Sequence, residues 1–483
     1  MAPARNRFMV SATHRSSGKS TISIGLCAAL AGRGLAVQPY KKGPDYIDPM
    51  WLAAASGRPC RNLDPWLCDA EEIRASFDRH SADADVALVE GNTGLHDGLA
   101  LDGADSNAAL ARMLDLPVVL VIDARGMTRG VAPLLLGQQA FDRGVRIAGV
   151  VLNNVNGSRH EAKLRMAIEH YTDVPVLGAV QQDGRLTIVE RHLGLVPSNE
   201  SGDVARLVGD IAAAVARQVD LDALLATVGQ AAPLPARHGA DRRAPASGDI
   251  RIGIAEDRAF GFYYADDLDA LRAAGATLPR FDTLNDGDLP RVDALFIGGG
   301  FPELHARELE ANAALRARIR GAIEAGMPVY AECGGLMYLA RSLTHDGHRY
   351  RMVGAIPGDV VMRERPVGRG YVELEETGAF PWAMRASSGA RVRGHEFHHA
   401  AIENLPPDVR FAYAVRRGHG VDGGRDGIVT RNVLASFTHL RSTRHNDWAA
   451  RFVDFVRRSD YYRRRRDNIV ALGVPRVREA PLV

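Results

Sequence analysis

The sequence predicts an α/β protein built from two parallel-sheet domains in succession. In the first half, short apolar runs alternate with longer amphipathic stretches, a pattern typical of βαβ units around a parallel sheet. Between residues 231 and 249, alanine, proline, glycine and arginine are concentrated without apolar periodicity, which indicates an interdomain linker. The alternation then starts again. We therefore expect a first domain over residues 1–230, a linker over 231–249, a second domain over 250–445 and an arginine-rich tail over 446–483.

The expected elements follow from these runs. In the first half, the predicted strands are Phe8–Val10, Val86–Val89, Val118–Ile122, Ile147–Leu152 and Val174–Leu177, and the predicted helices are Thr21–Arg33, Ser106–Leu114 and Arg159–His170. In the second half, the predicted strands are Ile250–Ile254, Ala294–Ile297 and Pro328–Ala331, and the predicted helices are Tyr264–Ala274 and Leu309–Ala325. The rest of the second half is expected to be rich in strands.

Composition narrows the class of protein. A chain of 483 residues is too long for one core, since domains run roughly 100–200 residues. The net charge of +2 gives no case for a nucleic-acid or acidic-lipid partner. The apolar runs are shorter than the roughly 20 residues that span a bilayer, and the four cysteines lack paired spacing. The first predicted strand leaves no room for a signal peptide. We expect a reduced, cytoplasmic enzyme with no membrane partner.

A glycine-rich loop, Ser11–Thr21, follows the first predicted strand and resembles GxxxxGK[ST], although its first glycine is replaced. In this strand–loop–helix context, backbone N–H groups can wrap phosphates at a helix N-terminus, while Lys19 reaches the outer phosphates and the Ser20 hydroxyl completes a Mg²⁺ site. The alternative is a turn that only caps a helix. We expect an ATP phosphate site formed by Ser17, Gly18, Lys19, Ser20 and Thr21.

Two acidic positions suit the Mg²⁺ that accompanies ATP. Glu90 ends an apolar strand, where the carboxyl edge of a parallel sheet places ligands. Asp45 and Asp48 lie on a loop shaped by proline and glycine, Lys41–Pro49. Each acid alone is more often a cap or turn residue, but together with Lys19 they indicate function. The expected metal ligands are Ser20, Asp45 and Glu90.

A second chemistry is indicated by Cys333, which stands between an apolar strand and a helix predicted over Leu336–Leu343. The glycines after it permit the tight strand-to-helix turn that exposes a nucleophile, and helix N–H groups favour its thiolate. Acyl transfer through a thiol also needs a base, and His439 is the best-placed histidine. Gly299 and Gly300, in the run after another strand, are candidate oxyanion donors. The alternative for Cys333 is a small core residue.

One further motif, His395–His399, matches HExxH, the pattern of zinc proteases. That chemistry requires both histidines on one face of a helix. The surrounding segment Val392–Phe397 instead has the pattern of a strand, so we do not expect zinc there.

Together these motifs resemble the cobyrinic acid a,c-diamide synthases and the hydrogenobyrinic acid a,c-diamide synthases. The resemblance covers about residues 7–445. The segments that carry it are Lys42–Pro49, Gly57–Asp64, Glu90–Gly98, Glu190–Pro197, Gly298–Glu303, Ala331–Met337 and Gly394–His398.

The resemblance implies a fold and a set of roles. It implies an N-terminal P-loop domain like dethiobiotin synthetase and a C-terminal class I glutamine amidotransferase domain. In the first domain, Asp45, Glu90 and Ser20 match the Mg²⁺ positions of the family. Asp48 and Asp97 match positions close to the reacting carboxylate, and Tyr46 is a further candidate for a substrate contact. Asn153 and Asn154, after the strand Val150–Leu152, are candidates for contacts to the nucleotide base.

In the second domain, the resemblance implies that Cys333 takes the amide of glutamine as a thioester and that His439 activates the thiol. Ammonia then passes internally to the ATP site, where it displaces phosphate from an activated carboxylate. Class I members commonly carry His-x-Glu, but Leu440 and Arg441 follow the histidine here. The subgroup usually lacks that acid, so a Cys–His dyad is expected.

The function that the resemblance implies is ATP- and glutamine-dependent amidation of the a and c carboxylates of cobyrinic or hydrogenobyrinic acid, in cobalamin biosynthesis. Lys42 and Met50–Leu52 depart from many members beside the expected substrate loop, so the same chemistry on a sirohydrochlorin- or sirohaem-type ring stays open. A regulatory P-loop ATPase with a glutamine-sensing module and an RNA-binding protein that uses Arg457–Arg466 are alternatives from other classes. The expected partners are small molecules, with a homodimer as a further hypothesis.

Overall fold

The computed structural model describes residues 6–186, 188–191, 194–229, 248–382 and 389–471. The chain divides into two compact units, Met1–Asp241 (unit 1) and Arg242–Val483 (unit 2). Apart from Gly248 and Asp249, the predicted linker lies outside the described residues.

Unit 1 is built on a parallel sheet of seven strands within its described residues, in the order β3-β2-β4-β1-β5-β6-β7. The strands at its centre are buried along their whole length, which explains their nearly continuous apolar sequence. The strands are β1 (Asn6–Ala12), β2 (Val37–Lys42), β3 (Arg61–Leu63), β4 (Val86–Glu90), β5 (Val118–Asp123), β6 (Ile147–Val155) and β7 (Val176–Gln181), beside the short pair β8 (Glu190–Arg191) and β9 (Gly194–Leu195).

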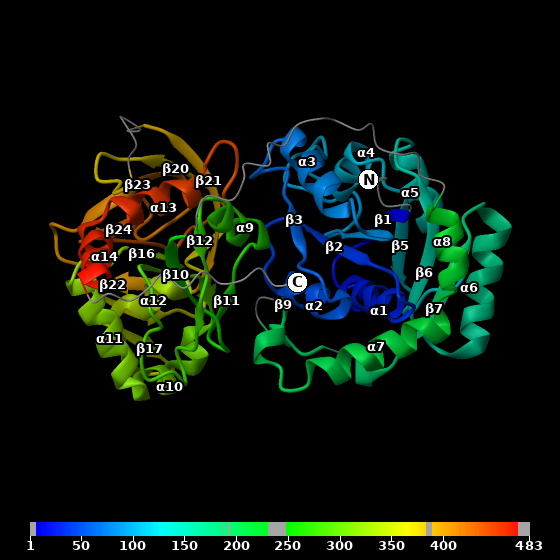
Figure 1. Ribbon diagram of the computed structural model, residues 1–483. Coiled ribbons are helices and arrows are strands. Elements are labelled where there is room, and N and C mark those ends of the chain that lie inside the picture. Colours follow the sequence, from blue (N-terminus) through cyan, green and yellow to red (C-terminus); the bar gives the residue numbers. More distant parts are fainter. Residues whose placement is uncertain (1–5, 187, 192–193, 230–247, 383–388, 472–483) are drawn as a thin grey trace. The chain divides into compact units, whose positions relative to one another are not determined.

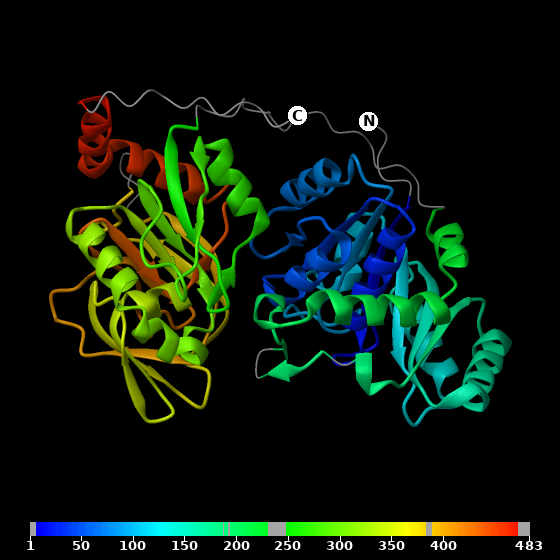
Figure 2. The ribbon, with the colours of Figure 1, turned by 60° about the horizontal axis from the view of Figure 1, so that its bottom comes forward.

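Helices cover both faces of this sheet (Figure 1). Helices α1, α2 and α7 pack against one another on one face, with α7 alongside α1, while α3, α4 and α5 lie on the other side (Figures 1 and 2). The helices of unit 1 are α1 (Lys19–Gly32), α2 (Ile47–Ser56), α3 (Ala70–Ser81), α4 (Asn107–Met113), α5 (Val131–Phe141), α6 (Gly157–Tyr171), α7 (Val204–Gln218) and α8 (Leu221–Val228). This is the predicted P-loop type of α/β domain.

Unit 2 contains a mixed sheet of eleven strands among its described residues. Its parallel part has the order β12-β10-β14-β16-β25, and antiparallel strands β24, β23, β20, β21 and β26 continue it. The strands are β10 (Ile250–Ala255), β12 (Ala276–Thr277), β13 (Arg280–Phe281), β14 (Ala294–Ile297), β16 (Val329–Glu332), β20 (Gly368–Glu376), β21 (Arg391–His398), β23 (Arg410–Arg417), β24 (Arg425–Thr430), β25 (Val433–Ser436) and β26 (His439–Leu440).

Smaller elements complete unit 2. A further sheet has the order β18-β17-β19-β22, and β11 pairs with β15. These strands are β11 (Phe260–Phe262), β15 (Gly299–Gly300), β17 (Ala340–His345), β18 (His348–Arg351), β19 (Ile356–Met362) and β22 (Ala400–Glu403). The helices are α9 (Ala265–Ala273), α10 (Ala306–Ala311), α11 (Ala313–Glu324), α12 (Gly334–Leu339), α13 (Trp448–Arg458) and α14 (Asp460–Ala471).

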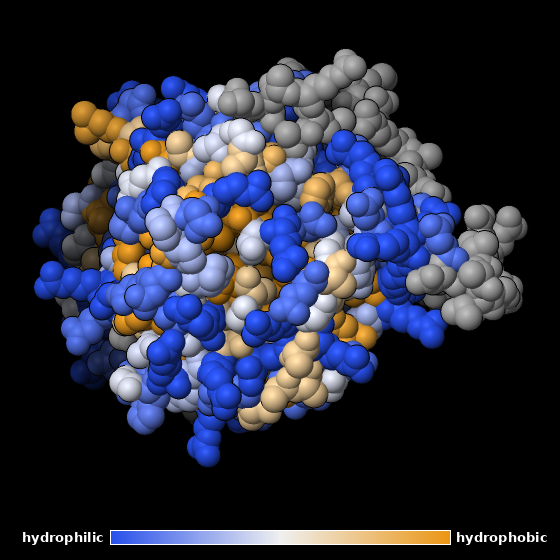
Figure 3. Space-filling view, turned by 90° about the vertical axis from the view of Figure 1, so that its left-hand side faces the viewer, coloured by the Kyte–Doolittle hydropathy of each residue, from blue (hydrophilic) through white to orange (hydrophobic). Residues whose placement is uncertain are grey.

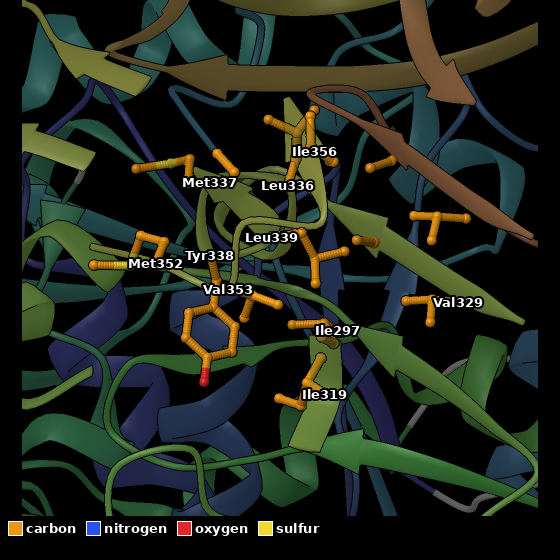
Figure 4. Packing of buried hydrophobic residues seen from close by; sticks show 14 of the residues in the cluster. Ile297, Ile319, Val329, Leu336, Met337, Tyr338, Leu339, Met352, Val353 and Ile356 are labelled. Carbon is orange, nitrogen blue, oxygen red and sulfur yellow. The ribbon is translucent and has the colours of Figure 1, made fainter. Parts of the chain in front are cut away.

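The large sheet of unit 2 separates two apolar clusters. In one, Ile297 and Val329 of the sheet meet Leu336 and Leu339 of α12 and Ile319 of α11 (Figure 4). The other cluster joins the first strand of the unit to α13 and is rich in aromatic rings. The surface shown in Figure 3 is covered mainly by hydrophilic side chains, with apolar ones visible between them.

The arginine-rich segment at residues 457–466 makes specific contacts in unit 2. Helix α13 buries Trp448 and Phe452 in the aromatic cluster. From α14, Arg464 donates to Ala325 O at the end of α11, and Arg465 binds both Val292 O and the Asp293 carboxylate. A cation at the C-terminal end of a helix is favourable because the carbonyl groups there carry partial negative charge.

Two predicted elements differ from the structure. The helix predicted over Leu309–Ala325 is two helices, α10 and α11, because the Asn312 side chain accepts a hydrogen bond from Leu315 N and starts a new helix. The helix predicted over Leu336–Leu343 ends at Leu339, and the next residues form β17. The strand predicted over Val392–Phe397 is confirmed as part of β21, so the HExxH residues do not lie on a helix.

We predict that Phe452→Ala lowers the free energy of unfolding of unit 2 by about 3–5 kcal/mol, because it leaves a cavity among fully buried aromatic rings. Urea unfolding, followed by proteolysis and mass spectrometry to assign the transition to unit 2, measures the change. Arg458→Ala on an exposed position of the same helix is the matched control, and a change within about 0.5 kcal/mol is expected. Equal effects of the two variants would contradict a core role for α13.

Candidate functional site

The first candidate site is the loop between β1 and α1. Helix α1 begins at Lys19, directly after Gly18, whose φ of 84° is in the left-handed region. A Cβ at Gly18 would overlap the Asn153 side-chain amide, which donates to Ser17 O at 3.0 Å. The end of β6, which carries Asn153, therefore holds the glycine-rich loop in place through this hydrogen bond.

Strand register brings charged residues together beneath this loop. Glu90 ends β4 and is opposite Lys41 of β2 and Val10 of β1. Its buried carboxylate accepts hydrogen bonds at Oε1 from Lys41 Nζ at 2.9 Å and Lys19 Nζ at 3.0 Å. The Ser20 hydroxyl donates to the same oxygen at 2.7 Å.

The start of helix α2 and the loop before it add two more carboxylates to this cluster. Asp48, in its first turn, bonds Lys41 Nζ and accepts from the Ser20 hydroxyl at 3.1 Å. Asp45 lies 3.7 Å from Lys41 Nζ and accepts from the backbone N–H groups of Ile47 and Asp48. The structure thus brings the predicted residues Lys19, Ser20, Asp45, Asp48 and Glu90 to one place.

Lys41 balances these carboxylates. Burial by itself would lower the pKa of its ammonium group, but Asp48, Glu90 and Asp45 raise that pKa well above the ordinary value, so Lys41 stays charged. Burial and the neighbouring Asp48 raise the pKa of Asp45. For Asp48, burial is outweighed by Lys41 and Lys19, which lower its pKa. The two carboxyls therefore differ in how readily they take up a proton.

The oxygen atoms of this cluster fit a divalent cation. Mg²⁺ prefers carboxylate and hydroxyl oxygens together with phosphate oxygens. Glu90 Oε2 is buried and has no hydrogen-bond partner among the described residues, whereas its other oxygen has three donors. A buried carboxylate oxygen without a donor is costly unless something else occupies it. The donor set of Ser20, Asp45 and Glu90 is therefore compatible with Mg²⁺.

Other predicted residues of unit 1 lie around the cluster. Tyr46 is buried at the N-terminal end of α2. Asp97 is exposed and accepts from Gly94 N at 2.9 Å, and Gly94 itself lies next to the glycine-rich loop at Thr13. Asn154 does not face that loop, since its amide donates to the Asp123 carboxylate at 3.1 Å. Thr21 is in the first turn of α1.

The second candidate site is the turn between β16 and α12. Cys333 occupies this turn with φ 47° and ψ −103°, a conformation that costs energy for a residue with a side chain. Its N–H donates to Ser436 O at 2.7 Å and its carbonyl accepts from Met337 N at 3.1 Å. These bonds hold the strained residue in place.

His439 lies next to this cysteine. The Cys333 thiol donates to Phe397 O at 3.9 Å, and Cys333 is one of the groups that raise the pKa of His439. A Cβ at Gly299 would lie 2.6 Å from His439 Cε1, and a Cβ at Gly334 would lie 3.1 Å from Gly300 N. The glycine run therefore packs against both the histidine and the cysteine turn, and only residues without a side chain fit there.

The other side of the imidazole faces an acid. His439 Nδ1 is 3.3 Å from Oε2 of Glu332, the residue directly before the cysteine. Burial opposes charge on the ring, but the hydrogen bonds and charges of Cys333 and Glu332 raise the pKa of His439 to about 10. The expected Cys–His pair is therefore accompanied by an acid, Glu332, which contacts the histidine.

Two further residues surround His439. The buried Asp426 carboxylate accepts from Phe437 N at 3.1 Å and Thr438 N at 3.0 Å and thereby fixes the backbone that leads to the histidine. His395 of β21 pairs in register with His439, and burial together with the charge of His439 lowers the pKa of His395 to about 3. His395 is therefore uncharged at neutral pH.

Sequence reasoning did not assign a role to Lys41 or Glu332. Each is a charged residue at or next to the end of a buried strand, β2 or β16. Glu332 follows the apolar run Val329–Ala331, where a charged residue is rarely buried without a partner, and this signal is visible in the sequence. Strand β2 is mostly polar and gives no such signal for Lys41. The partners of Lys41 and Glu332 come from other strands and cannot be recognised from the sequence.

Comparisons with known proteins match both units. Residues 8–196 match the CobQ/CobB/MinD/ParA nucleotide binding domain, and residues 251–447 match the CobB/CobQ-like glutamine amidotransferase domain. The two candidate sites lie within these two matches. The P-loop and amidotransferase fold predicted from the sequence is confirmed, and unit 1 is a nucleotide-binding domain.

Curated relatives match along nearly the whole chain. A cobyrinate a,c-diamide synthase of Magnetococcus marinus is 45% identical over 93% of this chain and 97% of its own length. One of Methanosarcina acetivorans is 42% identical over 93% of this chain and 95% of its own. One of Streptococcus sanguinis is 38% identical over 94% of this chain and 100% of its own.

Among the described residues, no helix is both long and apolar enough to cross a bilayer.

We predict that Gly18→Ala weakens ATP binding at least about tenfold, which is about 1.4 kcal/mol, because the new Cβ meets the Asn153 amide at a backbone angle that alanine adopts poorly. Isothermal titration calorimetry measures the affinity. Gly32→Ala, at the last residue of α1 and away from the loop, is the control, since a Cβ there meets nothing within 4 Å, and unchanged affinity is expected. Native affinity in Gly18→Ala would exclude this loop as the phosphate site.

Proposed function

Because the chain belongs to the family of cobyrinate a,c-diamide synthases, we propose that it is an ATP-dependent ligase that converts the a and c carboxylates of cobyrinic or hydrogenobyrinic acid into amides, with glutamine as the nitrogen donor. This reaction belongs to cobalamin biosynthesis. The observation that carries the proposal is the presence, in one chain, of a lysine–carboxylate cluster at a nucleotide-binding loop and a Cys–His pair at a strand end.

We propose that unit 1 activates the substrate. A carboxylate is a poor electrophile, so an oxygen of the substrate carboxylate first attacks the γ-phosphorus of ATP, ADP leaves, and an acyl phosphate forms. Positioning and neutralisation of negative charge dominate such a transfer. Lys19 at the helix start and the buried Lys41 supply two ammonium groups at the ends of neighbouring elements. We assign substrate contacts to Tyr46, Asp48 and Asp97, and a nucleotide contact to Asn153.

Mg²⁺ fits the same cluster, with Ser20, Asp45 and Glu90 as its proposed ligands, and when bound it supplies charge neutralisation at the phosphates. The unpartnered Glu90 Oε2 supports this assignment.

We propose that unit 2 supplies the nitrogen. The Cys333 thiol gives its proton to His439, and the sulfur attacks the side-chain amide carbon of glutamine. Backbone N–H groups of the run that contains Gly299 and Gly300 are proposed to stabilise the oxyanion. His439 then gives the proton to the leaving nitrogen, ammonia is released, and water hydrolyses the thioester to glutamate.

The two half-reactions need each other. In bulk water at neutral pH, ammonia is mostly protonated to ammonium, which is not nucleophilic. Ammonia that is made on the same chain as the acyl phosphate can react before it is protonated. Ammonia attacks the acyl carbon and phosphate leaves, which completes the amide. We further propose a cytoplasmic location, where ATP and glutamine are available, and a homodimer.

The defining experiment is mass spectrometry of reactions that contain the protein, ATP, Mg²⁺ and glutamine. Cobyrinic acid, hydrogenobyrinic acid, sirohydrochlorin and sirohaem are offered separately. Each amide formed lowers the mass by a fixed increment, so one spectrum gives both substrate and number of amides. Two amides on a corrin acid are expected. Turnover on a sirohydrochlorin-type ring alone would agree with the proposed amidation mechanism but would contradict the corrin substrate.

Two variants separate the half-reactions. Cys333→Ser should lose glutamine-dependent amidation but keep activity with high ammonium, because the acyl phosphate still forms in unit 1. Lys19→Ala should lose activity with either nitrogen source, because the phosphoryl transfer fails. Product formation by mass spectrometry measures both. Loss of ammonium-driven activity in Cys333→Ser, or its persistence in Lys19→Ala, would contradict the division of labour.

A further inference from the structure

A buried carboxylate, that of Glu332, lies beside His439. Glu332 is the last residue of β16, and it is nearly inaccessible to solvent. The strand register places it opposite Ser436, three residues before the histidine. A buried carboxylate is unfavourable unless each oxygen has donors, so its partners indicate what it does.

The two oxygens of Glu332 have different partners. Oε1 accepts from Leu440 N at 2.9 Å and from the Tyr330 hydroxyl at 2.5 Å. Oε2 is 3.3 Å from His439 Nδ1. Oε1 is therefore held by Tyr330 and by Leu440, the residue after the histidine. Oε2 is left to accept from the imidazole.

The other ionisable groups around this pair do not supply a second base or acid for the histidine. His395 faces it from β21 and is uncharged at neutral pH, as described above. Arg441, two residues after the histidine, pairs with Asp266. The remaining titratable groups with an electrostatic effect on or from Glu332 are the side chains of Tyr263, Asp267, Tyr330 and Tyr413. Burial raises the pKa of each of these four groups.

We propose that Glu332 is the positioning residue of the glutamine-hydrolysing site, completing a Cys333–His439–Glu332 triad in which the acid comes from the residue before the nucleophile instead of from a position after the histidine. This role rests on the proposed function of Cys333 and His439. By accepting from Nδ1–H, Glu332 fixes the tautomer that leaves Nε2 free to take the thiol proton.

The proton balance is simple. The Cys333 proton moves to His439 Nε2, which yields a thiolate and an imidazolium. Glu332 keeps its negative charge and holds the Nδ1 proton throughout, so the imidazolium is stabilised by an adjacent charge in a site with little water. When the nitrogen of glutamine leaves, the Nε2 proton goes to it and the neutral imidazole returns.

Glu332→Gln tests this role. A glutamine at this position must keep its carbonyl oxygen toward Leu440 N and Tyr330, so its NH₂ faces Nδ1, and the imidazole proton is forced onto Nε2. We expect glutamine-dependent turnover to fall about 100-fold or more, with little change in KM for glutamine and unchanged ammonium-driven amidation. The pH of half-maximal alkylation of Cys333 by iodoacetamide should rise by about one unit or more.

Alkylation is read at the Cys333 peptide by mass spectrometry, and it needs no tetrapyrrole. A failed substrate assignment therefore leaves the alkylation result interpretable. Glu376→Gln is the matched control, because Glu376 is also a buried carboxylate of the same sheet but pairs with Arg451 at 2.6 and 3.0 Å. This control should leave the alkylation profile in place, and Glu332→Asp, which retains the charge, should lie between the native protein and Glu332→Gln.

An unchanged alkylation profile in Glu332→Gln, with or without loss of turnover, would overturn the proposal. If the variants at 332 do not fold, Tyr330→Phe provides a second test. It removes one donor from Glu332 and so leaves the carboxylate a stronger acceptor for the imidazolium. The alkylation midpoint should then shift in the opposite direction, to lower pH, and no shift would equally overturn the proposal.

Discussion

The contact between Lys41 and Glu90 is the interaction on which the first site depends. Three carboxylates lie around one buried ammonium, and without it their mutual repulsion and desolvation would neutralise or separate them. Lys41 and Glu90 are register partners on adjacent parallel strands, so the sheet itself places the pair. The loop at Lys19 and the helix of Asp48 then attach to it. The ion pairs of Lys41 thus fix the position of the glycine-rich loop relative to the segment that carries Asp45 and Asp48.

Unit 2 follows the same logic with a different ion pair. A carboxylate at the end of β16 and an imidazole after β25 are brought together because those strands are neighbours. The strained backbone at Cys333 is held by hydrogen bonds with Ser436 of β25 and Met337 of α12, and Asp426 fixes the segment before His439. In both units, groups of opposite charge come from the carboxyl ends of adjacent parallel strands, which is where open α/β sheets place their chemistry.

Much of this arrangement could be predicted from the sequence. The glycine-rich loop and the turn at Cys333 are local signals, because a few consecutive residues determine both the geometry and the chemistry. The apolar alternation located the main strands, although it missed the break at Asn312, where a single side chain caps a new helix. The roles of Lys41 and Glu332 could not be predicted, since their partners are 49 and 107 residues away in the sequence. Only the strand order brings them within reach.

The core that α13 completes has a consequence for how the protein is made. The aromatic cluster of unit 2 joins Ile250, near the start of the unit, to Val456, near its end. This core cannot close while the ribosome still holds the last of these residues, whereas the sheet of unit 1 can fold much earlier in synthesis. A nascent chain therefore acquires its nucleotide-binding unit first. The unit that carries Cys333 and His439 therefore completes its core last.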